Sequence, residues 1–298
     1  METLRTPDEC FASLPGYDFE PTYVTVDGIR IHTVDTGPRD GHPIVLLHGE
    51  PSWSFLYRHM IRPLAAAGYR VVAPDLVGFG RSDKPAKRED YTYARHLNWL
   101  SGALDALDLG QSTLFCQDWG GLLGLRLLAE TPARFARVVA ANTFLPTGRE
   151  PMPEAFHTWR KHSQTVETFD IGRVIDHGTA TTLAPEVIAA YNAPFPEERY
   201  KEGARQFPML VPATPDAPGA AENQAAWLGL MKLETPFLTA FADKDPITRG
   251  ADKFLQRLIP GAKGQAHCTV ENAGHFLQED QGKTLADIVL RFIAATPQ

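Results

Sequence analysis

Asp118 stands at an abrupt change in the pattern of the sequence. The apolar run 112–116, which is typical of a strand, stops at this carboxylate, and the pair Gly120-Gly121 and a leucine-rich helical pattern follow. Strand, sharp turn and helix is the pattern of a nucleophile elbow, which presents a catalytic side chain at its tip. A carboxylate presented there can attack carbon and form an ester. Because Asp also begins helices, this stretch alone is equally consistent with a plain helix N-cap.

Two further polar residues follow predicted strands. Asp245 follows the last strand but one, and His275 follows the last strand. The order nucleophile, acid, histidine is that of α/β-hydrolases. We expect Asp118 to attack the substrate, His275 to take a proton from the water that hydrolyses the ester, and Asp245 to orient the imidazole. Asp243 competes with Asp245 for the acid role, and each residue taken alone has a plain structural interpretation.

The loop His48-Gly49-Glu50 follows another predicted strand, 44–47. In α/β-hydrolases this loop gives one backbone N–H to an oxyanion hole, and the residue after the nucleophile gives the other. The two donors would be the backbone amides of Glu50 and Trp119. They would stabilise the oxyanion that forms when water attacks the ester. A plain turn is the alternative interpretation of His48-Gly49.

The elements that must position these residues alternate along the chain. Strands are expected at 23–26, 29–34, 44–47, 70–73, 112–116, 135–141, 236–241 and 267–270, and helices at 53–67, 91–107, 121–130, 254–258 and 284–295. This alternation predicts an α/β fold with a mostly parallel central sheet and flanking helices, and the turn Asp27-Gly28 adds an antiparallel hairpin.

The middle of the chain breaks this alternation. From about 144 to 224 we predict no strand, and prolines interrupt short helical segments. The sequence therefore predicts an α/β-hydrolase core domain at 1–143 and 225–298, with an inserted helical cap domain at 144–224. The cap would cover the carboxyl ends of the strands, where open α/β sheets bind their ligands.

Composition excludes several classes of protein. The 298 residues are 43% hydrophobic and carry a net charge of −7 without a basic block, which argues against nucleic acid as a partner. Three irregularly spaced cysteines argue against a disulfide framework or a metal site. Gly78-x-Gly80-x-Ser82 lacks the setting of a phosphate loop. We see no signal peptide and no run of transmembrane length, so we expect a soluble, cytoplasmic protein with no membrane partner.

Four segments together resemble haloalkane dehalogenases: 48–54, 75–85, 116–121 and 273–276. The similarity extends from about residue 20 to 293 and includes the cap segment 193–196. The resemblance implies hydrolysis of a haloalkane to a primary alcohol, a halide ion and a proton through a covalent aspartyl ester. It also implies that haloalkane, water and halide are the partners, with no cofactor, and we expect a monomer.

The resemblance also implies a halide site. In the branch of the family that this chain resembles most, two tryptophan indole N–H groups hold the leaving halide, one after the nucleophile and one in the cap. These match Trp119 and Trp159, with Phe156 as a neighbouring wall of the substrate pocket, whereas the other branch has Asn in place of Glu50. An indole offers one N–H donor and a broad apolar wall, which suits a large, weakly basic anion. Core packing is the alternative for both tryptophans.

Two other functions remain as alternatives. An epoxide hydrolase shares the fold, the aspartate nucleophile and the His–Asp pair, but it protonates an alkoxide from cap tyrosines, for which Tyr191 and Tyr200 are candidates. Trp159 and the Cys116-Gln117 pair before Asp118 favour the dehalogenase. A non-catalytic scaffold of the same fold would not need an intact triad.

Overall fold

The computed structural model describes residues 1–297, and its centre is an eight-stranded sheet. The strand order is β10-β9-β8-β7-β4-β5-β3-β2. The strands are β2 (Thr22–Val26), β3 (Ile29–Thr36), β4 (Pro43–Leu47), β5 (Arg70–Pro74), β7 (Ser112–Gln117), β8 (Phe135–Ala141), β9 (Phe237–Ala242) and β10 (Cys268–Val270). Neighbours from β5 to β10 are parallel, while β3 pairs antiparallel with both β2 and β5. The predicted mostly parallel sheet with an antiparallel edge is confirmed.

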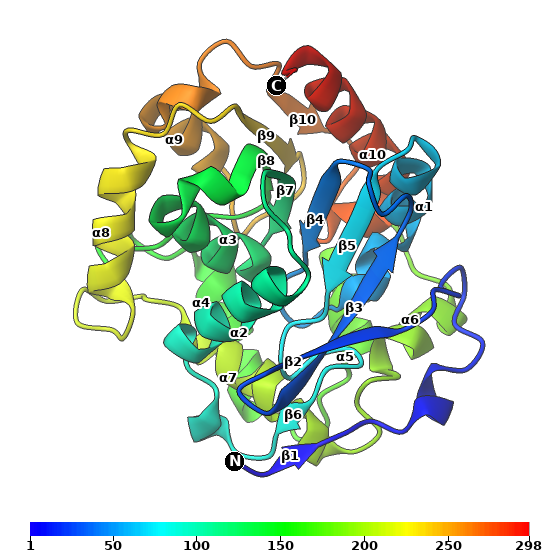
Figure 1. The fold of residues 1–298 in the computed structure, drawn as a ribbon. Helices are drawn as coiled ribbons and strands as arrows, with labels where there is room; N and C mark the ends of the chain where they lie inside the picture. Colours follow the sequence, from blue (N-terminus) through cyan, green and yellow to red (C-terminus); the bar gives the residue numbers. More distant parts are fainter. Residues whose placement is uncertain (298) are drawn as a thin grey trace.

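Helices cover both faces of this sheet (Figure 1). Helices α1 (Arg58–Ala66) and α10 (Leu277–Ala295) pack together on one face. On the other face lie α2 (Tyr93–Ala106), α3 (Trp119–Glu130), α8 (Ala220–Leu230) and α9 (Ala251–Leu258). Because both faces are covered, the central strands β4 and β7 are almost wholly buried and read as continuous apolar runs.

Two helix starts differ most from the sequence prediction. The region expected to be one helix from residue 53 begins as a 3₁₀ turn, Ser54–Tyr57, before α1. Helix α10 starts at Leu277 rather than at 284, and Gln281 inside it has non-helical φ and ψ angles. The segment before Gln281 is too short to show a helical period in the sequence, and its Leu277 and Gln278 side chains are buried. None of the described helices has both the length and the apolar character needed to cross a bilayer.

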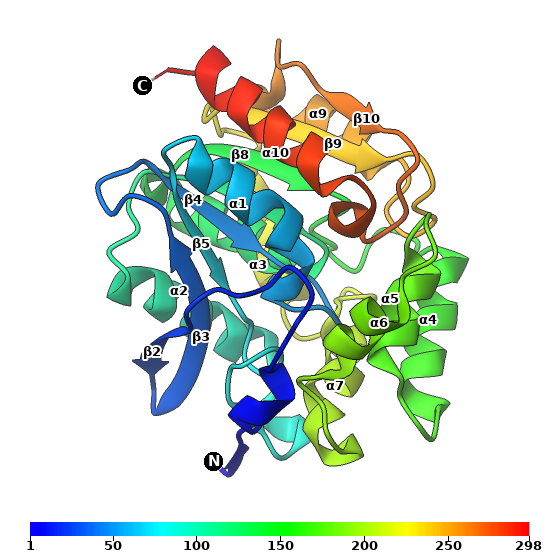
Figure 2. The ribbon, with the colours of Figure 1, turned by 90° about the vertical axis from the view of Figure 1, so that its right-hand side faces the viewer.

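Between β8 and β9 the described chain contains helices and no strand, as predicted. These are α4 (Glu154–Thr165), α5 (Ile171–Gly178), α6 (Pro185–Asn192), α7 (Glu202–Leu210) and α8. Figure 2 shows α4 to α7 gathered on one side of the sheet. The expected cap boundary after Gln224 falls inside α8, which packs on α3 of the core. A boundary at the start of α8 keeps that helix whole.

The N-terminal segment adds a feature that the sequence did not predict. Strand β1 (Thr3–Leu4) pairs antiparallel with β6 (Lys84–Pro85), and the Thr6 hydroxyl donates to the Pro194 carbonyl oxygen at 2.7 Å. A strand of two residues is too short to show an alternating pattern. Its partner also lies about 80 residues away in the sequence, so no local turn signals the pairing. This contact joins the start of the chain to the helical region after β8.

Candidate active site

Asp118 lies at the tip of β7, with φ 49° and ψ −124°. A non-glycine residue with positive φ costs about 1–3 kcal/mol and persists only where its surroundings hold it. Here the Asp118 amide donates to the Asn142 carbonyl oxygen at 3.1 Å, and the Asp118 carbonyl accepts from the Thr143 hydroxyl at 2.8 Å. Although Asp118 is the N-cap residue of α3, its side chain makes no capping hydrogen bond. The carboxylate is therefore free to face other groups.

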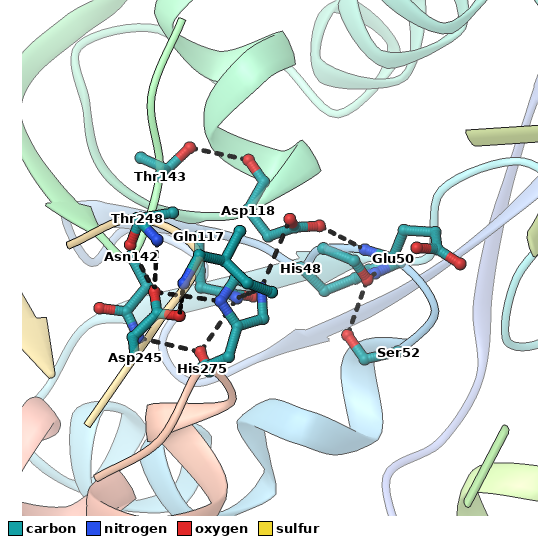
Figure 3. A network of polar contacts seen from close by, with 12 residues as sticks. His48, Glu50, Ser52, Gln117, Asp118, Asn142, Thr143, Asp245, Thr248 and His275 are labelled. Atoms are coloured by element: carbon teal, nitrogen blue, oxygen red, sulfur yellow. Dashed lines mark hydrogen bonds and ion pairs between the residues drawn. The ribbon is translucent and has the colours of Figure 1, made fainter. Parts of the chain in front are cut away.

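Two glycines allow neighbouring backbone to reach the elbow closely. A Cβ on Gly49 would lie 2.3 Å from the Asp118 Cβ, and one on Gly120 would lie 2.1 Å from the Leu47 carbonyl oxygen. Any side chain at either position would push the elbow away from β4. With glycine there, the Glu50 amide donates to Asp118 Oδ1 at 2.8 Å (Figure 3). One expected oxyanion-hole donor thus faces the carboxylate.

The loop that carries this amide is held by His48. Burial lowers the pKa of His48, so the imidazole is neutral. The Leu76 amide donates to Nε2 at 2.9 Å, which places the proton on Nδ1, and Nδ1 donates to the Gly49 carbonyl oxygen at 2.9 Å. The Ser52 hydroxyl donates to the same oxygen at 2.8 Å. Both hydrogen bonds fix the direction of the peptide that ends in the Glu50 amide.

The structure brings the three predicted triad residues together (Figure 3). His275 Nε2 lies 3.4 Å from Asp118 Oδ2, and His275 Nδ1 lies 3.2 Å from Asp245 Oδ2. His275 is 5% exposed and Asp245 2% exposed. Asp243 is exposed and accepts a hydrogen bond from the Ala273 amide instead. Of the two candidate acids, Asp245 is the one beside the imidazole.

The charges of these groups support one another. Burial alone would lower the pKa of His275, but the carboxylates of Asp245 and Asp118 outweigh it and raise the pKa to about 10. Burial alone would raise the pKa of Asp245, but His275 and the donors Thr248 and Ile247 outweigh it and lower the pKa to about 2. Asp245 is therefore ionised at neutral pH and stabilises a positive imidazole.

Two residues to which the sequence interpretation gave no role in the site hold the His275 loop. Asn142 Nδ2 donates to the carbonyl oxygens of Gly274 and His275, each at 3.0 Å, and its Oδ1 accepts from the Ala242 amide at 2.9 Å. Gln117 Nε2 lies 3.2 Å from both His275 Nε2 and its carbonyl oxygen. Asn142 directly follows β8, as Asp118 directly follows β7. A polar residue at the end of a predicted strand was the available signal.

A cavity of about 1250 Å³ opens above these groups. Asp118, Trp119 and His275 line it from the core, and Phe156 and Trp159 line it from α4. The Trp159 ring packs against Phe169, with ring centroids 5.8 Å apart. The lining is mostly apolar, which suits an alkyl group.

The tyrosines that an epoxide hydrolase would need are not part of the cavity lining. The Tyr191 hydroxyl donates to Glu279 Oε2 at 2.5 Å, and Tyr200 packs in the hydrophobic core. Neither can protonate an alkoxide formed beside Asp118. This geometry argues against the epoxide hydrolase alternative.

Comparison with known proteins adds a family match. Residues 42–281 match the family model of the alpha/beta hydrolase fold. The chain is 58% identical to a haloalkane dehalogenase of Psychrobacter cryohalolentis, over 100% of both chains. It is 51% identical to a haloalkane dehalogenase of Mycobacterium marinum, over 97% of this chain and 99% of the relative. The tetrameric haloalkane dehalogenase DpaA of Paraglaciecola agarilytica superposes with a TM-score of 0.91 at 35% identity, over 98% of both chains.

Proposed function

The chain belongs to the haloalkane dehalogenases of the α/β-hydrolase fold, and we propose how its residues divide the work of the reaction. The enzyme hydrolyses a haloalkane to a primary alcohol and a halide ion through a covalent ester. One observation carries the assignment of residues: the Asp118 carboxylate faces an apolar cavity with His275 beside it and two indole groups in the lining. The epoxide hydrolase alternative is not favoured.

In the first step Asp118 is the nucleophile. The Glu50 amide holds Oδ1, which leaves Oδ2 to attack the carbon that carries the halogen. The new carbon–oxygen bond forms as the carbon–halogen bond breaks, and the halide leaves with the bonding electrons. The indole N–H groups of Trp119 and Trp159 stabilise the growing negative charge, and Phe156 forms a wall for the alkyl group.

In the second step His275 is the general base. The ester carries no charge, so alkylation removes the Asp118 contribution to the raised pKa of His275. The pKa falls, and the imidazole can accept a proton from the water that attacks the ester carbonyl carbon. The backbone amides of Glu50 and Trp119 hold the oxyanion, and Asp245 stabilises the imidazolium. Collapse of the intermediate breaks the bond between the former carbonyl carbon and the alkoxide oxygen, and the alkoxide takes the proton from His275 and leaves as the alcohol. Loss of the remaining proton to solvent restores the Asp118 carboxylate.

His275→Phe tests this division of work. The variant should still attack the substrate but should not hydrolyse the ester, because it lacks the base. After incubation with 1-bromobutane, peptide mass spectrometry should find one butyl group on Asp118. Asp118→Asn is the matched control and should carry none. The assignment of Asp118 and His275 would be wrong if the wild type releases bromide but the His275→Phe variant never gains a butyl group.

We propose the predicted division into a core and a helical cap, with the second boundary moved from 224 to the start of α8. The core then spans 1–143 and 220–298, and the cap spans 144–219. The Thr6–Pro194 hydrogen bond and the Arg88–Glu202 ion pair of 2.5 Å join the cap to the core and support one rigid wall over the cavity. Limited proteolysis should cut first in the loops of 144–219, and cleavage within the sheet first would contradict the division.

We also propose that the enzyme is a monomer and works in the cytoplasm. Few large apolar side chains are exposed in the described chain, and its three cysteines are free, as a reducing compartment favours. Light scattering at micromolar concentration tests the first proposal, with a tetramer as the contrary result, since the similar DpaA is tetrameric. Cell fractionation against a periplasmic marker enzyme tests the second.

A further inference from the structure

The Glu50 side chain is a buried acid on the cavity wall that no step above uses. It is 4% exposed and lines the cavity, and its Oε1 has no hydrogen-bond partner in the described structure. No Lys or Arg of residues 1–297 pairs with it, and its nearest like charge is Asp118, whose Oδ1 accepts from the Glu50 amide. A buried carboxyl without a counter-ion beside a carboxylate favours its neutral form.

The charges that act on this carboxyl come from two elements. Burial and the Asp118 carboxylate at the elbow raise its pKa well above the usual range, whereas a Trp159 hydrogen bond and His275 oppose them more weakly. Further ionisable groups line the same cavity: Glu150, Glu154, His162, His177, Lys244 and Arg249. A neutral Glu50 has one carbonyl acceptor and one O–H donor.

The Trp159 contact sets up a competition. An indole has a single N–H, so Trp159 cannot fully serve both the Glu50 carboxyl and a halide ion. Its ring is packed by Phe169 and stacks on His162 with centroids 6.1 Å apart, which keeps the indole at the cavity wall in either arrangement. The Glu50 carboxyl and the Trp159 indole thus line the same cavity, and the indole is close enough to act on the pKa of Glu50.

We propose that Glu50 is a positioning residue that occupies the Trp159 N–H in the empty site and yields it to the halide, so that Glu50 sets how tightly the halide product is held. This inference rests on the proposed role of Trp159 as a halide donor. An uncharged Glu50 competes mildly and lets the halide enter. An ionised Glu50 would hold the indole more strongly and repel the anion.

Bromide titrations followed by tryptophan fluorescence test the competition. Glu50→Met removes the acceptor but keeps the backbone amide that faces Asp118, so bromide should bind roughly three- to tenfold more tightly, as expected for one lost competing hydrogen bond. If bromide release limits turnover, kcat should fall while the rate of alkylation is retained. Equal or weaker bromide binding by a folded Glu50→Met variant would overturn the proposal.

The pH profile supplies a readout that a purely structural role would not change. In the wild type, bromide binding should weaken from neutral to alkaline pH as Glu50 ionises. Glu50→Gln keeps the acceptor but cannot ionise, so its profile should lack this part of the decline. Loss of the positive charge on His275 affects both proteins equally and cancels in the comparison. Identical profiles for the two proteins would overturn the proposal.

The Trp159→Phe background separates this inference from the proposed function. If Trp159 holds halide, Trp159→Phe alone should weaken bromide binding, and Glu50→Met should then have no further effect. Unchanged bromide binding by Trp159→Phe would reject the halide role of Trp159. A normal effect of Trp159→Phe together with an undiminished effect of Glu50→Met in that background would reject only the competition.

Discussion

His275 and its two carboxylate neighbours show how single residues depend on one another. Asp245 is locked in place by the Ile247 amide at 2.9 Å and by the Thr248 hydroxyl, so it can only face the imidazole. Asp118 is less enclosed, because its side chain is 21% exposed and opens to the cavity. In the proposed mechanism, the permanent charge of Asp245 orients the base, and the charge of Asp118, which disappears on alkylation, controls when the base acts.

Titration of His275 tests this dependence. Asp118→Asn removes a negative charge that stabilises the imidazolium, so the pKa of His275 should fall from about 10 by about 1–3 pH units. Asp245→Asn should lower it further, because Asp245 has the larger effect. NMR titration with ¹⁵N-labelled histidine measures both, and His267, outside the cavity lining, is the internal control. An unchanged His275 pKa in Asp118→Asn would contradict the proposed timing of the base.

At the scale of elements, the proposed cap and the proposed core each line one side of the cavity. The parallel strands β4, β7, β8 and β9 end at one edge of the sheet, which brings Glu50, Asp118, Asn142 and Asp245 together. Helix α4 supplies Phe156 and Trp159 from the other side. A contact between α6 and the core helices joins the two sides. Arg58 of α1 and Glu279 of α10 form a buried ion pair of 2.5 Å, and the Tyr191 hydroxyl of α6 donates to Glu279.

Two tryptophans from different helices, Trp159 and Trp227, allow a matched test of the proposed halide donor in α4. Trp159→Phe should reduce kcat/KM for 1-bromobutane by roughly 10²-fold, as for loss of one donor to a developing charge, and should diminish bromide-dependent quenching. Trp227→Phe is the control, because Trp227 in α8 donates to the Leu145 carbonyl oxygen at 2.8 Å and lies outside the cavity lining. Similar losses of activity in both variants would indicate general damage to the fold and not a lost halide donor.

At the scale of the whole molecule, the size of the cavity bears on the substrate. A volume of about 1250 Å³ is large beside the pockets of about 300–1,000 Å³ that bind small organic molecules. Apolar residues of the proposed core and cap line it, including Leu122, Val174, Val211 and Phe254. A short haloalkane leaves most of this surface without contact, whereas a longer chain covers it.

Chain length should therefore govern apparent affinity. Each added methylene that is buried contributes up to about 0.8 kcal/mol, so KM should fall two- to fourfold per carbon from 1-bromoethane towards 1-bromohexane. Initial rates of bromide release, measured over a range of concentrations of each bromoalkane, give KM and kcat for each member of the series. A KM that is independent of chain length would mean that the alkyl tail stays in solvent.

The sequence alone was sufficient for features that depend on short-range pattern. Apolar runs that end in turns predicted the eight strands of the main sheet, and Asp27-Gly28, both with positive φ, predicted the hairpin at its edge. The two-residue strands β1 and β6 carry no such pattern. The order of Asp118, Asp245 and His275 along the chain was readable because each residue directly follows a strand, and parallel strands end at the same edge.

Tertiary structure decided which side chains meet. Only the packed chain shows Asp245 turned to His275 and Asp243 turned to solvent, although the two residues differ by two positions in one loop. Only the packed chain turns Tyr191 to Glu279 and brings Glu50 of the β4 loop to Trp159 of α4. These contacts join residues far apart in sequence, and their strength depends on burial, which no local pattern contains.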